Sequence, residues 1–273
     1  MRTRPLTNHS DHVNILGVPI AAVNPRAAVD RINAWIDAGV RTYVTVTGVH
    51  GIMESQGAPD LLEIHRRAGM CVPDGMPTVW LGWHQGFKDM DRVYGPDLML
   101  RFLEQSVARG TRHYFFGGAP GVPEQLRDRM VERFPGLRVV GTLSPPFRPM
   151  TDDEEARLRE DLAASRPDVL WVGLSTPKQE RWMAAHVGVV EAGVLIGVGA
   201  AFDFHTGRVR QAPRPVQRAG MEWAFRMVME PRRLWRRYLY NNPRFILRTL
   251  QQLSGLRTYS TNPKTQEGTC ESS

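Results

Sequence analysis

The chain has 273 residues, of which 42% are hydrophobic and 23% charged, an ordinary balance for a soluble globular protein. This length fits one large α/β domain, with or without an appendage, and allows a sizeable core. The net charge of +7 favours anionic partners such as phosphates, nucleic acid or a membrane face. No apolar run approaches the roughly 18 residues of a membrane span, and no signal peptide is expected from the polar N-terminus.

The two cysteines lie in different settings. Cys71 is part of an apolar run, whereas Cys270 lies in a polar tail. We therefore expect no disulfide between them, and this cysteine usage is compatible with a reducing cytoplasm.

The first predicted elements are a disordered segment, a strand pair and a helix. Residues 1–12 are polar and predicted to be disordered. The run 15–20 predicts an edge strand or hairpin, because the proline within it cannot donate to a strand ladder. Asn24 followed by Pro25 predicts a helix start with Asn24 as the N-cap, and Gly39 ends that helix.

Strands and helices then alternate along the chain as far as residue 204. Strands are expected at 43–47, 70–73, 113–116, 137–140, 168–174 and from 194. Helices are expected at 25–38, at 52–67 with a break near Pro59, from 77, at 96–109, at 122–134, from 151 and at 177–187. This alternation predicts an α/β fold with a doubly wound, mostly parallel, Rossmann-like sheet over residues 13–204.

The composition changes after Asp203. Residues 205–258 contain twelve arginines, no lysine and two acids, interleaved with aromatic residues. Arginine recognises phosphate with a planar pair of donors, where lysine offers a point charge. The segment therefore predicts a helical, amphipathic, Arg-rich appendage that suits an anionic membrane surface. A disordered tail is expected at 259–273.

Several predicted strands end in small or polar residues at one edge of the sheet. The clearest case is 194–204, where an apolar strand breaks into Gly-x-Gly and reaches an acid. In open α/β sheets, ligands bind outside the carboxyl ends of the strands. The strand ends concerned are 45–48, 74–75, 117–118, 173–176 and 199–203. Together they predict a ligand cleft.

Some of these ends carry candidate functional residues that also have a plain structural explanation. Asp74, between an apolar strand and a glycine, suits a general base, or it caps the next helix as an Asx-turn. Asp203 suits a hydrogen bond to a sugar or base, or it caps a turn. Gly117 and Gly118 precede a helix and present N–H groups to phosphate, or they form a tight turn.

No metal site is expected. Asp89 and Asp91 have the spacing that many nucleotide-sugar transferases use for a divalent cation, but the pattern is short, common and in a predicted exposed loop. Four histidines lack zinc spacing and are expected to be surface or packing residues, namely His50, His113, His186 and His205. Neither a Walker A nor a Gly-x-Ser-x-Gly pattern occurs.

Eight sequence blocks occur in the order found in one known family. They are Asp74-Gly75-Met76, 92–99 (RVYGPDLM), 116–122 (FGGAPGV), 172–180 (VGLSTPKQE), 197–203 (GVGAAFD), Gln211-Ala212-Pro213, 220–226 (GMEWAFR) and 230–238 (EPRRLWRRY). These blocks resemble the WecG/TagA/CpsF glycosyltransferases, also called glycosyltransferase family 26, and with their surroundings they cover residues 13–248. A match of this extent is far more specific than any single motif.

The resemblance implies a membrane-associated, inverting glycosyltransferase that needs neither metal nor cofactor. Such an enzyme moves a hexose, such as N-acetylmannosamine, from a UDP-sugar donor to a polyprenyl-diphosphate-linked saccharide in cell-surface polysaccharide synthesis. It implies a cytoplasmic protein attached peripherally to the anionic inner leaflet of the cell membrane, with no nucleic-acid partner. Self-association into a homo-oligomer stays open.

The family motifs also imply residue roles. Asp74 would be the general base, with Thr45 beside it in the active site. The implied substrate-binding residues are Thr47, Arg92, Asp97, Gly117, Gly118, Gln179, Gly199, Asp203, Arg226, Arg232, Arg233, Arg236 and Arg237. The last five would close over the diphosphates. Two positions depart from the family, since Thr47 stands where asparagine is usual and Pro77 where glycine is common, and both changes concern the sugar donor.

Two other functions compete with the transferase. A nucleic-acid-binding protein would use the Arg-rich, aromatic appendage on phosphates, but it leaves Asp74 and the strand-end glycines without a role. A peripheral membrane scaffold with a degenerate site would use only the appendage. UDP binding distinguishes them, because only the transferase requires it.

Overall fold

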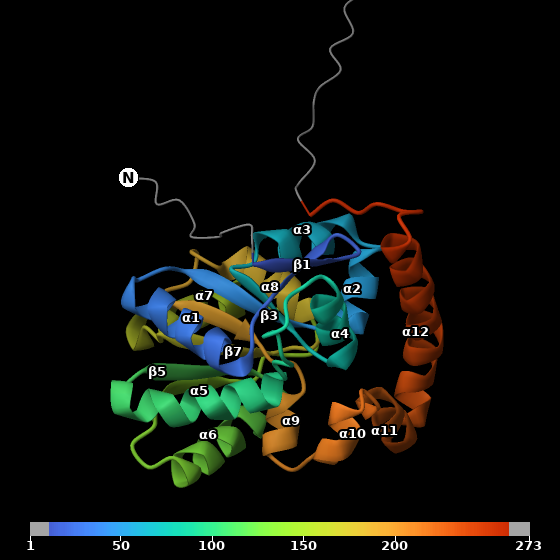
Figure 1. The fold of residues 1–273 in the computed structure, drawn as a ribbon. Helices are drawn as coiled ribbons and strands as arrows, with labels where there is room; N and C mark the ends of the chain where they lie inside the picture. The colour runs from blue at the N-terminus through green and yellow to red at the C-terminus, as the bar shows by residue number, and fades with distance from the viewer. Residues whose placement is uncertain (1–10, 262–273) are drawn as a thin grey trace, which may run out of the picture.

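The computed structural model describes residues 11–261, except for the side chains of Arg233 and Arg237. Its centre is a sheet of six parallel strands in the order β4-β3-β8-β7-β5-β6 (Figure 1). The strands are β3 (Thr42–Thr47), β4 (Met70–Pro73), β5 (Arg112–Gly117), β6 (Arg138–Leu143), β7 (Val169–Gly173) and β8 (Val194–Gly197). The predicted Rossmann-like α/β fold is confirmed.

Side chains of the strands alternate between two buried layers, as expected for a sheet covered on both faces. In β7, Val169 and Trp171 belong to one apolar cluster, whereas Leu170 and Val172 belong to the other. Helices α1 (Pro25–Asp37), α5 (Gly95–Arg109), α6 (Val122–Arg133) and α9 (Ala201–His205) cover the first face. Helices α3 (Pro59–Arg67), α7 (Asp152–Ser165) and α8 (Lys178–His186) cover the second.

Local sequence signals set several helix starts. The Asn24 side chain accepts two backbone N–H bonds at the start of α1, and Thr151 forms a capping box with Glu154 ahead of α7. The predicted helix over 52–67 is two helices, because Pro59 starts a new one. The remaining helices before the appendage are α2 (Val49–Ser55) and α4 (Met76–His84).

A separate antiparallel hairpin, β1 (His12–Ile15) and β2 (Val18–Ala21), packs against α3, α4 and β4. Its two turn residues, Leu16 and Gly17, both have positive φ, which matches a two-residue type I′ turn. The predicted hairpin is confirmed. Since His12 belongs to β1, it is ordered, whereas residues 1–10 of the expected disordered segment lie outside the described residues.

The arginine-rich appendage forms three helices along one side of the molecule (Figure 1). They are α10 (Arg214–Arg218), α11 (Glu222–Met229) and α12 (Pro231–Leu253). The far end of α12 is anchored at the hairpin, where Phe245 is buried in a shared apolar cluster and Gln252 Oε1 accepts from the Leu16 N–H at 2.9 Å. The appendage is therefore packed onto the sheet domain at both ends.

The chain after α12 continues along the hairpin. The backbone oxygen of Tyr259 accepts from Asn14 Nδ2 at 2.7 Å, and that of Ser260 accepts from Arg66. The first residues of the expected disordered tail thus contact the body of the protein. Residues 262–273, including Cys270, lie outside the described residues.

The described part of the chain contains no helix with both the length and the apolar character needed to cross a bilayer.

Candidate active site

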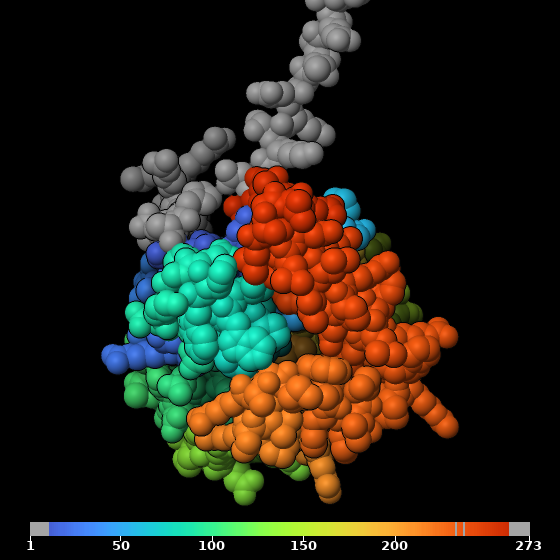
Figure 2. All heavy atoms as spheres, turned by 45° about the vertical axis from the view of Figure 1, so that its right-hand side comes forward, coloured from blue at the N-terminus to red at the C-terminus, as the bar shows by residue number. Residues whose placement is uncertain are grey.

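A cavity of about 690 Å³ lies between the carboxyl ends of β3 and β4 and the three helices of the appendage. In the space-filling view it opens as a hollow bounded by α4 (cyan), by α10 and α11 (orange) and by α12 (red-orange) (Figure 2). This is the edge of the sheet at which the strand ends predicted a ligand cleft. The sheet contributes one wall and the appendage the opposite wall.

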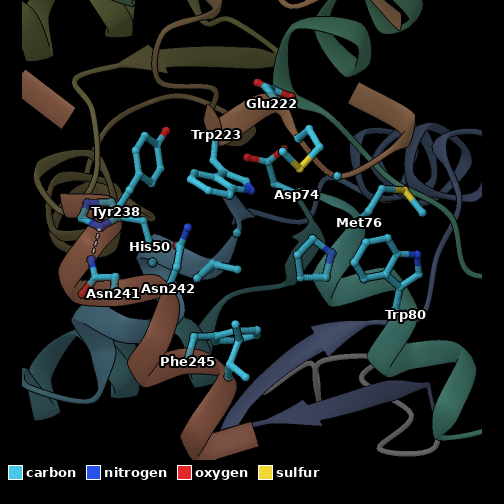
Figure 3. A pocket seen from close by; sticks show the side chains of 18 of the residues that line it. His50, Asp74, Met76, Trp80, Glu222, Trp223, Tyr238, Asn241, Asn242 and Phe245 are labelled. Atoms are coloured by element: carbon cyan, nitrogen blue, oxygen red, sulfur yellow. Dashed lines mark hydrogen bonds between the residues drawn. The ribbon is translucent and has the colours of Figure 1, made fainter. Parts of the chain in front are cut away.

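Asp74 follows directly on β4 and lies in the cavity wall (Figure 3). Its backbone N–H donates to the Thr47 oxygen at 3.1 Å, which ties the end of β4 to the end of β3. The next residue, Gly75, has a φ of +98°, which favours glycine and allows the chain to turn into α4. Two strand ends therefore hold the Asp74 backbone in place.

The turn after β3 passes very close to Asp74. A Cβ atom on Gly48 would lie 2.7 Å from the backbone oxygen of Asp74 and 3.5 Å from its Oδ2 atom. The φ of Gly48 is −105°, which any residue adopts, so the requirement for glycine comes from this contact. Gly48 thus sets how closely β3 and β4 approach at the site.

Thr45 and Thr47 lie beneath the cavity and do not line it. Both are buried, and their hydroxyl oxygens share a hydrogen bond of 2.8 Å. Cys71 on the neighbouring strand is buried with them, and burial raises the pKa of its thiol to about 12, so the thiol stays protonated. The two threonines support the strand ends that carry Asp74.

Two of the predicted arginines line the cavity, one from the body and one from the appendage. Arg92 donates to Gln217 Oε1 at 2.8 Å, pairs with Glu222 and stacks 4.1 Å from the ring centroid of Tyr94. The Nε atoms of Arg92 and Arg226 are buried and have no hydrogen-bond partner among the described residues. The positive charge of both side chains in the cavity wall suits an anionic ligand.

The other predicted arginines of the appendage do not reach the cavity or are not described. Arg232 and Arg236 are exposed on α12, and Arg236 lines a smaller hollow together with Trp235. Arg233 and Arg237 belong to α12, but their side chains lie outside the described residues. Of the described side chains in this set, Arg226 is the one that lines the cavity.

A family model fits most of the chain. The model of the glycosyl transferase WecG/TagA/CpsF family matches residues 13–259. The chain belongs to this family. It is therefore a glycosyltransferase, and the resemblance indicated by the eight sequence blocks is confirmed. This membership favours the transferase over a nucleic-acid-binding protein.

Two curated relatives of this glycosyltransferase are both named N-acetylglucosaminyldiphosphoundecaprenol N-acetyl-beta-D-mannosaminyltransferase. The protein from Bacillus spizizenii is 25% identical over 217 residues, which cover 80% of this chain and 82% of the relative. The protein from Bacillus subtilis is 22% identical over 251 residues, which cover 92% of this chain and 95% of the relative. The family match over residues 13–259 spans both the sheet domain and the appendage.

In this glycosyltransferase, Gln179 supports a turn at the edge of the sheet. Its Oε1 accepts from the Gly199 N–H at 3.0 Å, and its Nε2 donates to Glu180 Oε1 at 3.1 Å. Glu180 also accepts from Thr176, which lines the cavity, and burial raises the pKa of the Glu180 carboxyl. Gln179 and Gly199 are therefore joined to each other and linked to the cavity through Thr176.

Four further predicted residues do not line the cavity. The Gly118 N–H donates to the Gly173 oxygen at 3.1 Å, so this donor is engaged within the protein and not directed at a phosphate. A Cβ atom on Gly117 would lie 2.6 Å from that same oxygen, so close strand approach explains this glycine. Asp97 is exposed in the first turn of α5, and Asp203 lies within α9.

Several cavity residues have no recognisable pattern in the sequence. His50, expected to be a surface or packing residue, lines the cavity, and its Nδ1 lies 3.3 Å from Asn241 Nδ2 of α12 (Figure 3). Trp80 of α4 meets the appendage at Gly220, where a Cβ atom would lie 2.9 Å from the indole. For the wall of the cavity that the appendage forms, the sequence offered one signal, namely the aromatic residues interleaved with arginine.

The described residues offer no cluster of three or more His, Cys, Asp or Glu side chains suited to hold a metal ion. In the Asp-x-Asp pattern, Asp91 Oδ1 accepts from the Arg92 N–H at 2.7 Å, and Asp89 is exposed. Neither acid lines the cavity.

Proposed function

We propose that this chain is an inverting, metal-independent glycosyltransferase that moves a hexose from a UDP-sugar to a polyprenyl-diphosphate-linked saccharide. The observation that carries the proposal is a single cavity that contains a strand-end carboxylate, Asp74, together with Arg92 and Arg226. Transfer of this kind needs a base for the acceptor and cationic donors for the diphosphate of the leaving group. The cavity holds both kinds of group.

Asp74 is the proposed general base. In inverting transfer, an acceptor hydroxyl loses its proton as its oxygen attacks the anomeric carbon, so a carboxylate must lie within hydrogen-bond reach of that hydroxyl. Glu222 also lines the cavity, but it belongs to the appendage and does not follow a strand of the sheet. We therefore assign the base to Asp74, whose backbone is held by both strand ends.

Arg92 and Arg226 are the proposed stabilisers of the leaving group. As the bond between the anomeric carbon and UDP breaks, negative charge develops on the diphosphate oxygens. Fixed donors aimed at developing charge lower the barrier most when water is excluded. Both arginines lie in the wall of the same cavity as Asp74, which supports this assignment.

The names of the two Bacillus relatives support the choice of substrates, since they describe an N-acetylmannosaminyl transfer to N-acetylglucosaminyldiphosphoundecaprenol. We propose N-acetylmannosamine or a related hexose as the transferred sugar, in cell-surface polysaccharide synthesis. Of the two departures from the family pattern, Pro77 lines the cavity and Thr47 does not. Pro77 is therefore the better candidate for a direct effect on donor choice.

We also propose that the protein is cytoplasmic and attaches peripherally to the anionic inner face of the cell membrane through α12. This helix exposes Trp235, Leu239 and Tyr240 beside Arg232 and Arg236. Aromatic and cationic side chains together on one amphipathic helix favour the interface of an anionic bilayer.

The test of the proposed chemistry compares the wild type with Asp74→Asn. Each protein is incubated with a panel of UDP-sugars and with N-acetylglucosaminyl diphosphate on a short prenyl chain, and products are identified by mass spectrometry. Asp74→Asn is expected to lower kcat by about a hundredfold or more, because the base is lost. Calorimetry should show that its UDP affinity stays within about threefold of the wild type, because the arginines are unchanged.

Asp89→Asn is the matched control, since it makes the same chemical change at an exposed position outside the cavity. It should turn over like the wild type. A wild type that neither binds UDP nor forms product would overturn the proposed function. Normal turnover by Asp74→Asn would show that Asp74 is a structural residue.

A further inference from the structure

The cavity changes chemical character from one end to the other. Near the strand ends it presents Asp74, Arg92 and Glu222, all of them charged. Away from them it continues between α4 and α12, where its walls are apolar (Figure 3). We call this second part the α4–α12 groove and define it by Trp80, Leu81, Phe245, Ile246 and Leu250.

The α4–α12 groove extends from the buried interior to the surface. Phe245 is only 5% exposed and belongs to the apolar cluster beneath the hairpin. Ile246 and Leu250 line the same cavity and are 60% and 59% exposed. Side chains that line a cavity and are still largely exposed lie at its mouth. The groove therefore opens onto the outer surface of α12.

This combination selects an amphiphile as the occupant. A nucleotide or a sugar carries polar hydroxyl or phosphate groups over most of its length. In an apolar groove these groups would lose their hydrogen bonds to water and form none with the protein, which is unfavourable. A hydrocarbon chain has no such groups and gains from leaving water. A diphosphate joined to a hydrocarbon matches arginines at one end of the cavity and apolar walls at the other.

We propose that the α4–α12 groove binds the first isoprenoid units of the acceptor, next to its diphosphate. The inference rests on the proposed function, and it adds a site for the lipid to the sites for sugar and diphosphate. The saccharide then lies at Asp74, its own diphosphate lies between Asp74 and the groove, and the chain leaves along α4 and α12 at the exposed face of α12. Binding of the chain would hold the acceptor at the surface from which a membrane supplies it.

The groove makes a specific prediction about affinity. Because the chain is remote from the reacting atoms, its contacts are the same in the ground state and the transition state, so they affect binding and not kcat. Diphosphates with longer prenyl chains should bind more tightly until the groove is filled. Units beyond its mouth should add nothing in the absence of a membrane.

The experiment measures binding of methyl, geranyl and farnesyl diphosphate to the full-length protein by calorimetry, without detergent. In the wild type, farnesyl diphosphate is expected to bind at least about tenfold more tightly than methyl diphosphate. Ile246→Asp and Leu250→Asp place a charge in the groove, so both should lose most of this gain and keep the affinity for methyl diphosphate.

Leu247→Asp is the matched control. Leu247 follows Ile246 on the same helix and is 58% exposed, but it does not line the cavity. This variant should keep the full gain from the prenyl chain. Circular dichroism and sedimentation velocity on all variants establish that each is folded and in the same oligomeric state.

Three results would overturn the inference. The first is equal affinity of the wild type for methyl and farnesyl diphosphate. The second is an equal loss of the gain in all three variants, which would indicate a general apolar surface. The third is a change of oligomeric state in the groove variants alone, which would assign the groove to a second copy of the chain. This experiment measures binding only, so a failure of the proposed sugar transfer is detected separately, in the assay with UDP-sugars.

Discussion

The hydrogen bonds of His113 on β5 show how burial fixes the protonation state of a single residue. Trp171 Nε1 donates to His113 Nδ1 at 3.2 Å, and the other ring nitrogen lies 2.8 Å from Ser106 Oγ. An indole N–H only donates, so Nδ1 must accept and the ring proton must sit on Nε2. Burial lowers the pKa of His113 to about 3, because an imidazolium there would be poorly solvated.

Acid stability should depend on His113. The unfolded chain has a histidine pKa of about 6.5, so on acidification it binds a proton that the folded chain does not. Stability should therefore fall as pH falls below that value. From about pH 6.5 to about pH 4.5, the wild type is expected to lose about 2 kcal/mol more unfolding free energy than His113→Gln.

Urea unfolding at both pH values measures this difference. His84→Gln removes an exposed histidine and should behave like the wild type. Equal losses in the wild type and in His113→Gln would show that His113 is not the group that titrates.

The turn between β3 and α2 controls geometry at the scale of an element. It brings Gly48 against the backbone of Asp74, and that contact joins two segments separated by an entire helix pair. Since backbone atoms cannot rotate away as a flexible side chain does, an added methyl group must move one strand end relative to the other.

Gly48→Ala is expected to lower kcat by about ten- to a hundredfold, because the carboxylate of Asp74 is displaced from its productive position. Unfolding free energy should fall by about 1–3 kcal/mol, the usual cost of overpacking. Gly57→Ala is the control, since the nearest atom to its added Cβ is an ordinary contact at 3.8 Å. Steady-state kinetics and urea unfolding provide the measurements. An unchanged kcat in Gly48→Ala would show that this turn does not control the position of Asp74.

The whole molecule is held together across the cavity by contacts between the sheet domain and the appendage. Near the strand ends, Arg92 pairs with Glu222, and both side chains are mostly buried. At the far end, Phe245 and Gln252 anchor α12 to the hairpin. An ion pair near the strand ends and an apolar anchor at the far end therefore both help to position the appendage.

Glu222→Ala should loosen the near end of the appendage and not the far end. Removing one partner of a largely buried pair leaves a charge without compensation, and we expect the unfolding free energy to fall by about 3 kcal/mol. Hydrogen exchange should quicken in α11 and stay unchanged in α7. Asp30→Ala breaks an exposed pair with Arg26 and should cost about 0.5 kcal/mol or less. If Glu222→Ala changed the hydrogen-exchange rates of α11 and α7 to the same extent, this role would be contradicted.

The sequence alone was sufficient for the fold and for the family. Strand runs, helix periodicity and capping residues are local patterns, so they predicted the alternation of elements, the hairpin and the capped starts of α1 and α7. Their alternation leads to a parallel sheet, because each strand needs a helical crossover to return in the same direction. Asp74 could be found in the same way, since it directly follows a recognisable strand.

Only the tertiary structure decided which side chains share the cavity. It joined Arg92 to Glu222 and His50 to Asn241, and it left Asp97, Asp203 and both glycines of the β5 turn elsewhere. These contacts connect segments more than a hundred residues apart, and they depend on how the appendage packs across the sheet edge. A local pattern carries no information about that packing angle. Sequence therefore determined the elements and the chemistry they carry, whereas packing determined the site.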